Sequence, residues 1–195
     1  MASSSAEANT SGGLQWTCVK VAETRRDFCG VTACGIFPMK TADLIDDHAT
    51  KLRLVHLPFR LYGQKSYMCG PAQTVKCFED NTVLRGQLET PGEGRVLVVD
   101  AGGSTRIAVL GDMLADLAIA NGWAGVVISG AIRDSAEIAE MDTLIFALGT
   151  SPVKSAKDGL GKVGGIVELG GVRIAPGNWI YADADGVLMS TEKLV

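Results

Sequence analysis

Four charged side chains, one positive and three negative, have the types and the spacing that would bind a small acid beside a metal ion. Twenty residues separate Asp112 from Arg133, Asp134 follows directly, and Glu137 stands three positions further on. An arginine stays charged at any working pH and grips a carboxylate with two parallel hydrogen bonds. Aspartate supplies the hard oxygen ligands that Mg²⁺ and Mn²⁺ prefer. The set indicates a divalent-metal site for a small oxyanion, although an Arg-Asp dipeptide alone is as readily a solvated surface ion pair.

The composition is that of a globular domain with no nucleic-acid-binding surface. The 195 residues are 47% apolar and 21% charged, which favours a single domain with a substantial core. No apolar run reaches the roughly 18–20 residues of a membrane span. The net charge of −4 argues against a surface that tracks phosphates, so we expect neither a direct nucleic-acid partner nor a membrane partner. The 24 glycines gather in the second half and predict tight turns there.

The cysteines favour a reducing compartment. There are five, no C-x-x-C motif occurs, and no secretory signal precedes them, so we expect a cytoplasmic protein, with organellar targeting left open. Cys69 and Cys77 lie in an apolar, strand-like run and are predicted to be inert core thiols. Cys29 and Cys34 are close in sequence, but no basic neighbour would lower a thiol pKa, and their role is left open.

The other known motifs are absent, and the remaining candidate residues are weaker indications of function. The chain has no H-E-x-x-H, no zinc-type Cys/His spacing, no G-x-S-x-G and no phosphate-binding P-loop. The segment 102–104 is predicted to be a turn after a strand. His48 is expected to be structural, as are Trp123 and Trp179. Asp183 and Asp185 are expected to fix a turn.

Several elements are predicted before the centre of the chain. A small polar tail over 1–13 is expected to be disordered, and 14–195 is expected to form one catalytic domain. Its first part, 14–50, should be helical, with a clear helix start at Thr41. The rest of the N-terminal half should contain a loop with short extended pieces over 51–66, a strand over 68–78 and a helix over 79–89.

The centre of the chain alternates between buried strands and amphipathic helices. This order predicts parallel β-α-β units. The predicted strands are 96–99, 124–129 and 143–148, and the predicted helices are 112–121 and 135–141. From Gly159 onward short glycine-punctuated strands predict a mainly antiparallel sheet packed on the first, over 165–169, 172–175, 179–182 and 187–190.

This order places the charged residues where α/β folds bind ligands. Asp112 is in the first turn of a predicted helix, and Arg133 and Asp134 end a predicted buried strand. Helix N-termini offer free N–H groups, and strand ends form crevices. The backbone N–H groups of Asp112, Met113 and Leu114 can bind a substrate carboxylate that Arg133 also reaches, while Asp134 holds the metal.

Several stretches resemble the regulator of ribonuclease activity A family, which includes the class II 4-hydroxy-4-methyl-2-oxoglutarate aldolases. They are TVKCFEDN at 74–81, GRVLVVD at 94–100, GWAG at 122–125 and YADADGV at 181–187. The resemblance runs from Thr41 to Leu194. It implies an α/β fold that is a β/β/α sandwich of the swivelling-domain type, with central parallel β-α-β units and a glycine-rich C-terminal sheet. It also implies a homotrimer or hexamer. Some members carried an older methyltransferase label, yet no S-adenosylmethionine motif is visible.

The resemblance also implies roles for the charged set. The family's aldolases share D-x20-R-D-x2-E/D, which this chain matches throughout, whereas ribonuclease-regulating members like the first one named lack the aspartate after the arginine. By this resemblance Asp134 ligates Mg²⁺ or Mn²⁺ directly, and Asp112 and Glu137 hold it through water. Arg133 binds the pyruvyl part and steadies an enolate. The segment from Gly111 to Leu114, with Asp112 and Met113 between, supplies backbone donors.

The expected activity is metal-dependent cleavage of 4-hydroxy-4-methyl-2-oxoglutarate to pyruvate. Decarboxylation of oxaloacetate passes through the same enolate and should be a side activity. The base that takes the hydroxyl proton is left open between a water positioned by Asp112 and a carboxylate of a neighbouring subunit. The alternative is a non-catalytic regulator that binds and inhibits a ribonuclease of the ribonuclease E type. A relative that has lost function is a third reading.

Overall fold

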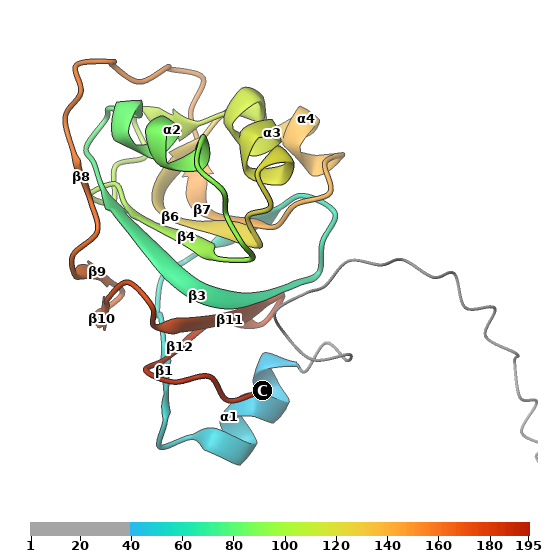
Figure 1. Ribbon diagram of the computed structural model, residues 1–195. Helices are drawn as coiled ribbons and strands as arrows, with labels where there is room; N and C mark the ends of the chain where they lie inside the picture. Colours follow the sequence, from blue (N-terminus) through green and yellow to red (C-terminus); the bar gives the residue numbers. More distant parts are fainter. Residues whose placement is uncertain (1–39) are drawn as a thin grey trace, which may run out of the picture. The chain divides into compact units, whose positions relative to one another are not determined.

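The computed structural model describes residues 40–195, and these form a mixed α/β fold, as the sequence predicted (Figure 1). The main sheet has the strand order β1-β12-β11-β3-β4-β6-β7-β2, with β5 attached to β6 and β8 attached to β3. No helix within residues 40–195 is long and apolar enough to cross a membrane. The predicted tail over 1–13 and the first part, 14–39, of the predicted helical segment 14–50 lie outside the described residues.

One long strand joins two differently built halves of the sheet. Strand β3 (Tyr67–Lys76) pairs its first half with β11 (Trp179–Asp183) in antiparallel register, Tyr67 opposite Asp183. Its second half pairs with β4 (Val96–Asp100) in parallel register, Ala72 opposite Val96. The C-terminal strands are therefore continuous with the parallel strands. The sequence had predicted a second sheet that only packs on the first, because strand patterns do not show which edges meet.

The parallel half contains the predicted β-α-β units. Strands β4, β6 (Gly125–Ile132) and β7 (Ile145–Thr150) run parallel, and β2 (Arg60–Tyr62) closes the edge antiparallel to β7. The connecting helices lie together on one side of the sheet in Figure 1. They are α2 (Thr82–Leu88), α3 (Asp112–Ala120) and α4 (Ser135–Ala139). Strand β5 (Ala108–Leu110), parallel to β6, was not predicted because three residues show no period.

The antiparallel half is built from short strands. Strand β12 (Gly186–Ser190) lies between β11 and β1 (Leu52–Leu54). The other short strands are β8 (Lys162–Val163), which pairs with β3, and β9 (Val167–Leu169) with β10 (Val172–Ile174), which form a separate hairpin.

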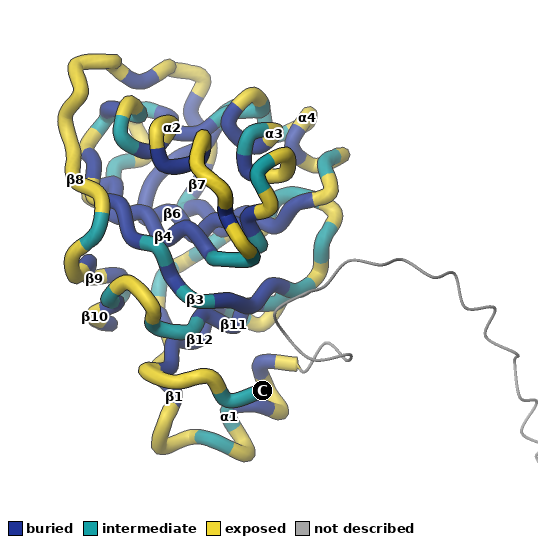
Figure 2. The backbone as a smooth tube through the Cα atoms, viewed as in Figure 1, coloured by how far each residue is buried: buried dark blue, intermediate teal, exposed yellow. Residues whose placement is uncertain are grey.

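The central strands are buried on both faces, which explains their unbroken apolar runs (Figure 2). Successive side chains of a strand point to opposite faces. Leu97 and Val99 of β4 belong to the core under the helices, together with Leu84 and Ile138. The alternate residues of β4, Val96 and Val98, belong to a second core with residues of β9 to β12. Two cores on one sheet give successive layers of helix, parallel sheet and antiparallel strands.

Asp183, the first of the two predicted turn residues, also stabilises the start of a helix. Asp183 Oδ1 accepts a hydrogen bond from the Asp185 amide at 3.0 Å, as the turn prediction required. The same carboxylate accepts bonds from the amide and hydroxyl of Thr41, at 2.7 and 2.6 Å. It thus satisfies free donors at the start of α1 (Thr41–His48), which the sequence had placed at Thr41. Leu44 then packs against Tyr181 on the outer face of β11.

The two cysteines that the structure describes, Cys69 and Cys77, differ in oxidation state. Cys77 is a buried free thiol, and burial first, with Asp100 and Asp80 adding, raises its pKa to about 12. It is the inert core thiol that was predicted. Cys69 is disulfide-bonded, so the prediction of a free thiol there was wrong. The spacing of cysteines does not show which sulfurs approach each other in space. Cys29 and Cys34 lie outside the described residues.

Candidate functional site

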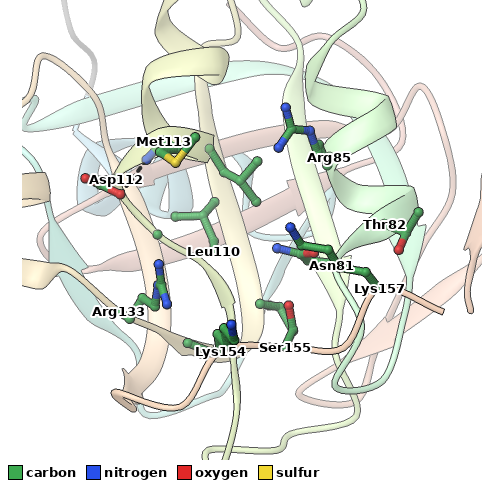
Figure 3. Close-up of a pocket in the computed structure, with 14 residues that line it drawn as sticks. Asn81, Thr82, Arg85, Leu110, Asp112, Met113, Arg133, Lys154, Ser155 and Lys157 are labelled. Carbon is green, nitrogen blue, oxygen red and sulfur yellow. Dashed lines mark hydrogen bonds between the residues drawn. The ribbon is translucent and has the colours of Figure 1, made fainter. Parts of the chain in front are cut away.

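A cavity of about 370 Å³ opens where α2 and α3 begin (Figure 3). Five of the predicted site residues line it: Gly111, Asp112, Met113, Leu114 and Arg133. They come together because β5 leads directly into α3, and because the Arg133 amide donates to the Leu110 carbonyl at 2.9 Å. The sequence prediction that these segments share one crevice agrees with this placement.

The start of α3 offers fewer free donors than the sequence indicated. The Leu114 amide already donates to the Gly111 carbonyl at 3.1 Å. The Met113 amide donates to Asp112 Oδ1 at 2.7 Å, so a carboxylate of the protein occupies the place where an external anion would bind. An incoming substrate carboxylate must therefore use the Asp112 amide or displace the Asp112 side chain from Met113.

Arg133 and Asp134 form an ion pair at the end of β6. Arg133 Nε lies 3.1 Å from Asp134 Oδ2. The Asp134 backbone is left-handed, with φ 53° and ψ 41°, and its carbonyl accepts from the Ile138 amide to start α4. A non-glycine residue in this conformation is strained by roughly 1–2 kcal/mol, and such strain gathers at functional sites. The geometry turns Asp134 out of the strand direction and against Gly111.

The carboxylate of Asp134 has an oxygen that lacks a hydrogen bond. Oδ2 is buried and, despite its ion pair with Arg133, accepts no well-aligned hydrogen bond. Buried polar atoms of this kind are rare and call for a ligand, an ion or water. No three His, Cys, Asp or Glu side chains converge on a metal position within residues 40–195. One carboxylate completed by water fits Mg²⁺, which keeps several waters and takes few protein ligands.

Asp134 and Glu137, two of the three predicted metal residues, lie outside the wall of the cavity. Asp134 stands behind Gly111, where a Cβ would come 2.6 Å from its Oδ2 and 3.1 Å from Arg133 Nε. Glu137 is exposed in the first turn of α4. Only a glycine at 111 thus leaves room for the ion pair to lie against the start of α3.

The opposite wall holds residues that the sequence reasoning missed. It is formed by the start of α2 and by the segment after β7, and its residues are Asn81, Thr82, Arg85, Lys154, Ser155 and Lys157. Both segments follow strands that run parallel to β6, so the rule that strand ends share one edge could have found them. Four cations line the cavity against the single carboxylate of Asp112. This balance favours an anionic ligand.

A buried carboxylate fixes that wall. Asp80 accepts hydrogen bonds from the amides of Thr82 at 2.7 Å, Asp158 at 2.6 Å and Leu160 at 3.3 Å. Burial by itself raises the pKa of Asp80, but these hydrogen bonds outweigh it and lower the pKa to about 2. Asp80 therefore stays charged near neutral pH and ties the segment after β7 to the start of α2.

Comparison with known proteins gives the family. Residues 41–189 match the family described as RraA-like, Aldolase/RraA. The chain belongs to the RraA-like family. The resemblance drawn from the sequence is thereby confirmed.

Individual members of the RraA-like family cover most of this chain. A protein of Aromatoleum aromaticum named "Putative 4-hydroxy-4-methyl-2-oxoglutarate aldolase" is 49% identical over 156 residues, which are 80% of this chain and 98% of that protein. A Geobacillus kaustophilus structure named as a 2-dimethylmenaquinone methyltransferase is 51% identical with a TM-score of 0.77, over 80% of this chain and 97% of the other. The RNA-processing inhibitor RraA of Thermus thermophilus is 40% identical with a TM-score of 0.78, over 82% and 96%.

Proposed function

We propose that this RraA-like protein is a divalent-metal-dependent lyase that cleaves 4-hydroxy-4-methyl-2-oxoglutarate to pyruvate and also decarboxylates oxaloacetate. One observation carries the proposal: the Arg133–Asp134 ion pair stands beside a cation-lined cavity at the start of α3, with one buried carboxylate oxygen lacking a hydrogen bond. The aldolase names of close relatives support it.

Each charged residue of the site has its own proposed role in this reaction. Arg133 would bind the carboxylate of the 2-oxo acid and stabilise the negative charge that develops when the bond between C3 and C4 breaks. The electron pair of that bond moves to the oxo group, and the C4 hydroxyl loses its proton as it becomes a carbonyl. The resulting enolate then takes up a proton at C3 and becomes pyruvate. Asp112, which lines the cavity, would orient the acceptor of that proton. Asp134, with Asp112 and Glu137 acting through water, would hold Mg²⁺ or Mn²⁺. The bound cation supplies Lewis acidity at the oxo oxygen.

A second function has its own support. The RNA-processing inhibitor of Thermus thermophilus shares this fold at 40% identity, so binding of a ribonuclease of the ribonuclease E type is the alternative. We also propose, from the family resemblance, that the protein assembles as a homotrimer or hexamer. The finer fold assignment, a β/β/α sandwich of the swivelling-domain type, agrees with the layers on either side of β4.

The decisive experiment follows product release with and without metal. We expect the purified protein to release pyruvate from 4-hydroxy-4-methyl-2-oxoglutarate, and CO₂ and pyruvate from oxaloacetate, in the presence of Mg²⁺. EDTA should abolish both activities, and excess Mg²⁺ should restore them, as a coupled lactate dehydrogenase assay can record. Turnover that survives EDTA, or none with Mg²⁺ or Mn²⁺, would refute the proposal. Inhibition of ribonuclease E by an inactive protein would instead favour the alternative.

A Gly111→Ala variant should lose activity without losing the fold. The Gly111 backbone, at φ −134°, accepts alanine, but the new Cβ would push the Arg133–Asp134 pair aside. We expect the free energy of unfolding, measured by thermal denaturation, to change by no more than about 1 kcal/mol. The side chain that must move, that of Asp134, is partly exposed and can shift. Turnover should fall at least about tenfold, since small displacements of positioned groups lose that much. Ala136→Gly, on the exposed side of α4, serves as a control. Unchanged turnover in Gly111→Ala would show that the pair's position is not required.

A further inference from the structure

Two acidic residues with a left-handed backbone follow strands that run parallel to each other. Glu79 comes after β3 with φ 54°, and Asp134 comes after β6 with φ 53°. Each contacts an arginine, Glu79 with Arg106 and Asp134 with Arg133. Asp134 belongs to the proposed site, whereas Glu79 has no role in it. Glycine adopts a left-handed backbone without strain, so a glutamate at position 79 indicates a function for its side chain.

The Glu79 side chain fastens the segment 104–106. Its Oε1 accepts hydrogen bonds from Ser104 Oγ at 2.7 Å and from Arg106 Nε and Nη2 at 3.1 and 2.7 Å. These bonds, that of Ser104 first, lower the pKa of Glu79, so the carboxylate is charged near neutral pH. The Glu79 side chain is 18% exposed, whereas that of Arg106 is 74% exposed. The Glu79 carbonyl also accepts from the Ala156 amide at 3.0 Å, so three distant segments meet at one residue.

The segment that Glu79 fastens leads directly into the floor of the cavity. Strand β5 begins two residues after Arg106. Its last residue, Leu110, lines the cavity and accepts a hydrogen bond from the Arg133 amide at 2.9 Å. Gly111 follows and lies against the ion pair of Arg133. The Arg106 carbonyl also accepts from Ser151 Oγ at 2.6 Å, where the segment after β7 begins. A shift of Arg106 would therefore move both walls of the cavity.

We propose that Glu79 is a positioning residue that clamps the segment 104–106 and so holds β5, with Gly111 behind it, in place against Arg133. An ion pair with an exposed arginine contributes little to stability, so the effect of the clamp is on geometry. Its consequence for turnover rests on the proposed function, because Arg133 must bind the substrate there. The clamp itself does not depend on which reaction the protein catalyses.

Glu79→Gly separates geometry from stability. Glycine relieves the left-handed backbone and removes the carboxylate, so the thermal unfolding midpoint should stay near that of wild type. Hydrogen exchange of the full chain, followed by mass spectrometry, should become at least about fivefold faster over 108–114 and 131–134 but not over β1 and β12. With 4-hydroxy-4-methyl-2-oxoglutarate and Mg²⁺, kcat should fall about tenfold while KM changes less, because small displacements of positioned groups act mainly on the chemical step.

Glu93→Gly is the matched control for this variant. Glu93 has the same left-handed backbone, with φ 52°, but it precedes β4 at the other end of the sheet. It forms no ion pair within residues 40–195. The control should keep wild-type exchange and wild-type kcat. Arg106→Gln removes the ion pair from its exposed end and leaves the Ser104 bond, so it should repeat the effects of Glu79→Gly at smaller size. The test therefore does not depend on whether Glu79→Gly folds.

Each outcome decides the proposal. Faster exchange and lower kcat in Glu79→Gly and Arg106→Gln, with neither in Glu93→Gly, support the clamp. Unchanged exchange over 108–114, an equal change in Glu93→Gly, or exchange that rises equally over β1 and β12 overturns it. Wild-type kcat despite faster exchange overturns the positioning role and leaves the lyase function standing. If wild-type protein turns over nothing yet local exchange depends on Glu79, the lyase proposal fails and the clamp stands.

Discussion

Asp134→Asn should lose metal affinity, whereas Arg133→Lys should keep it and lose turnover. Asparagine preserves the size of Asp134 and tolerates its left-handed backbone, so the change removes mainly the charge. We expect Mn²⁺ affinity to fall more than about 100-fold, because a neutral amide replaces the one carboxylate that we propose as a direct ligand. Lysine keeps the charge of Arg133 but loses the planar fork. Turnover should fall about 10²–10³-fold, as when one preorganised donor to a developing oxyanion is removed.

Calorimetric titration with Mn²⁺ and steady-state kinetics measure the two effects. Asp116→Asn, exposed on α3 outside the cavity, and Arg173→Lys, exposed on β10, are matched controls that should behave as wild type. Both site variants should fold, because each side chain is about one-third exposed. If Arg133→Lys lost metal as completely as Asp134→Asn, or if Asp134→Asn kept full turnover, the division of roles would be wrong.

Asp80→Asn should destabilise the protein at neutral pH but not in strong acid. The buried carboxylate accepts three backbone hydrogen bonds, and one amide oxygen cannot replace its two charged oxygens. We expect the free energy of unfolding to fall by about 2–3 kcal/mol at pH 7, in the range of hydrogen bonds to charged groups. Urea titrations of both proteins between pH 7 and pH 2 measure the difference.

The sign of the pH dependence follows from the lowered pKa. The pKa of Asp80 is about 2 in the folded chain and near its ordinary value of 3.8 in the unfolded chain. Its stabilising contribution is therefore complete above about pH 4 and is lost as pH falls toward 2. The difference between wild type and Asp80→Asn should shrink over that window. Asp158→Asn, an exposed carboxylate in the same segment, should show no such difference. A constant difference down to pH 2 would mean that Asp80 acts by shape rather than charge.

The sequence alone determined most of the elements and half of the cavity. Unbroken apolar runs such as 96–99 predicted strands buried on both faces, because such strands lack alternation. The alternation of strands and helices then placed Asp112 and Arg133 at one sheet edge. Both predictions rest on local patterns, namely the period of apolar residues and the spacing of elements. Such patterns follow directly from the backbone geometry of helices and strands. The family resemblance rested on short motifs of the same local kind.

Only the tertiary structure decided what depends on approach between distant segments. The pairing of β3 with β11 and β4, the capping of Thr41 by Asp183, and the disulfide state of Cys69 all join positions whose spacing in the chain carries no signal. The same holds for the lysine-bearing wall of the cavity. The position of this wall depends on hydrogen bonds between Asp80 and residues 158 and 160. These residues are far apart in the chain, so burial and hydrogen bonding decide how the loop closes. No periodic pattern in the sequence reports such a closure.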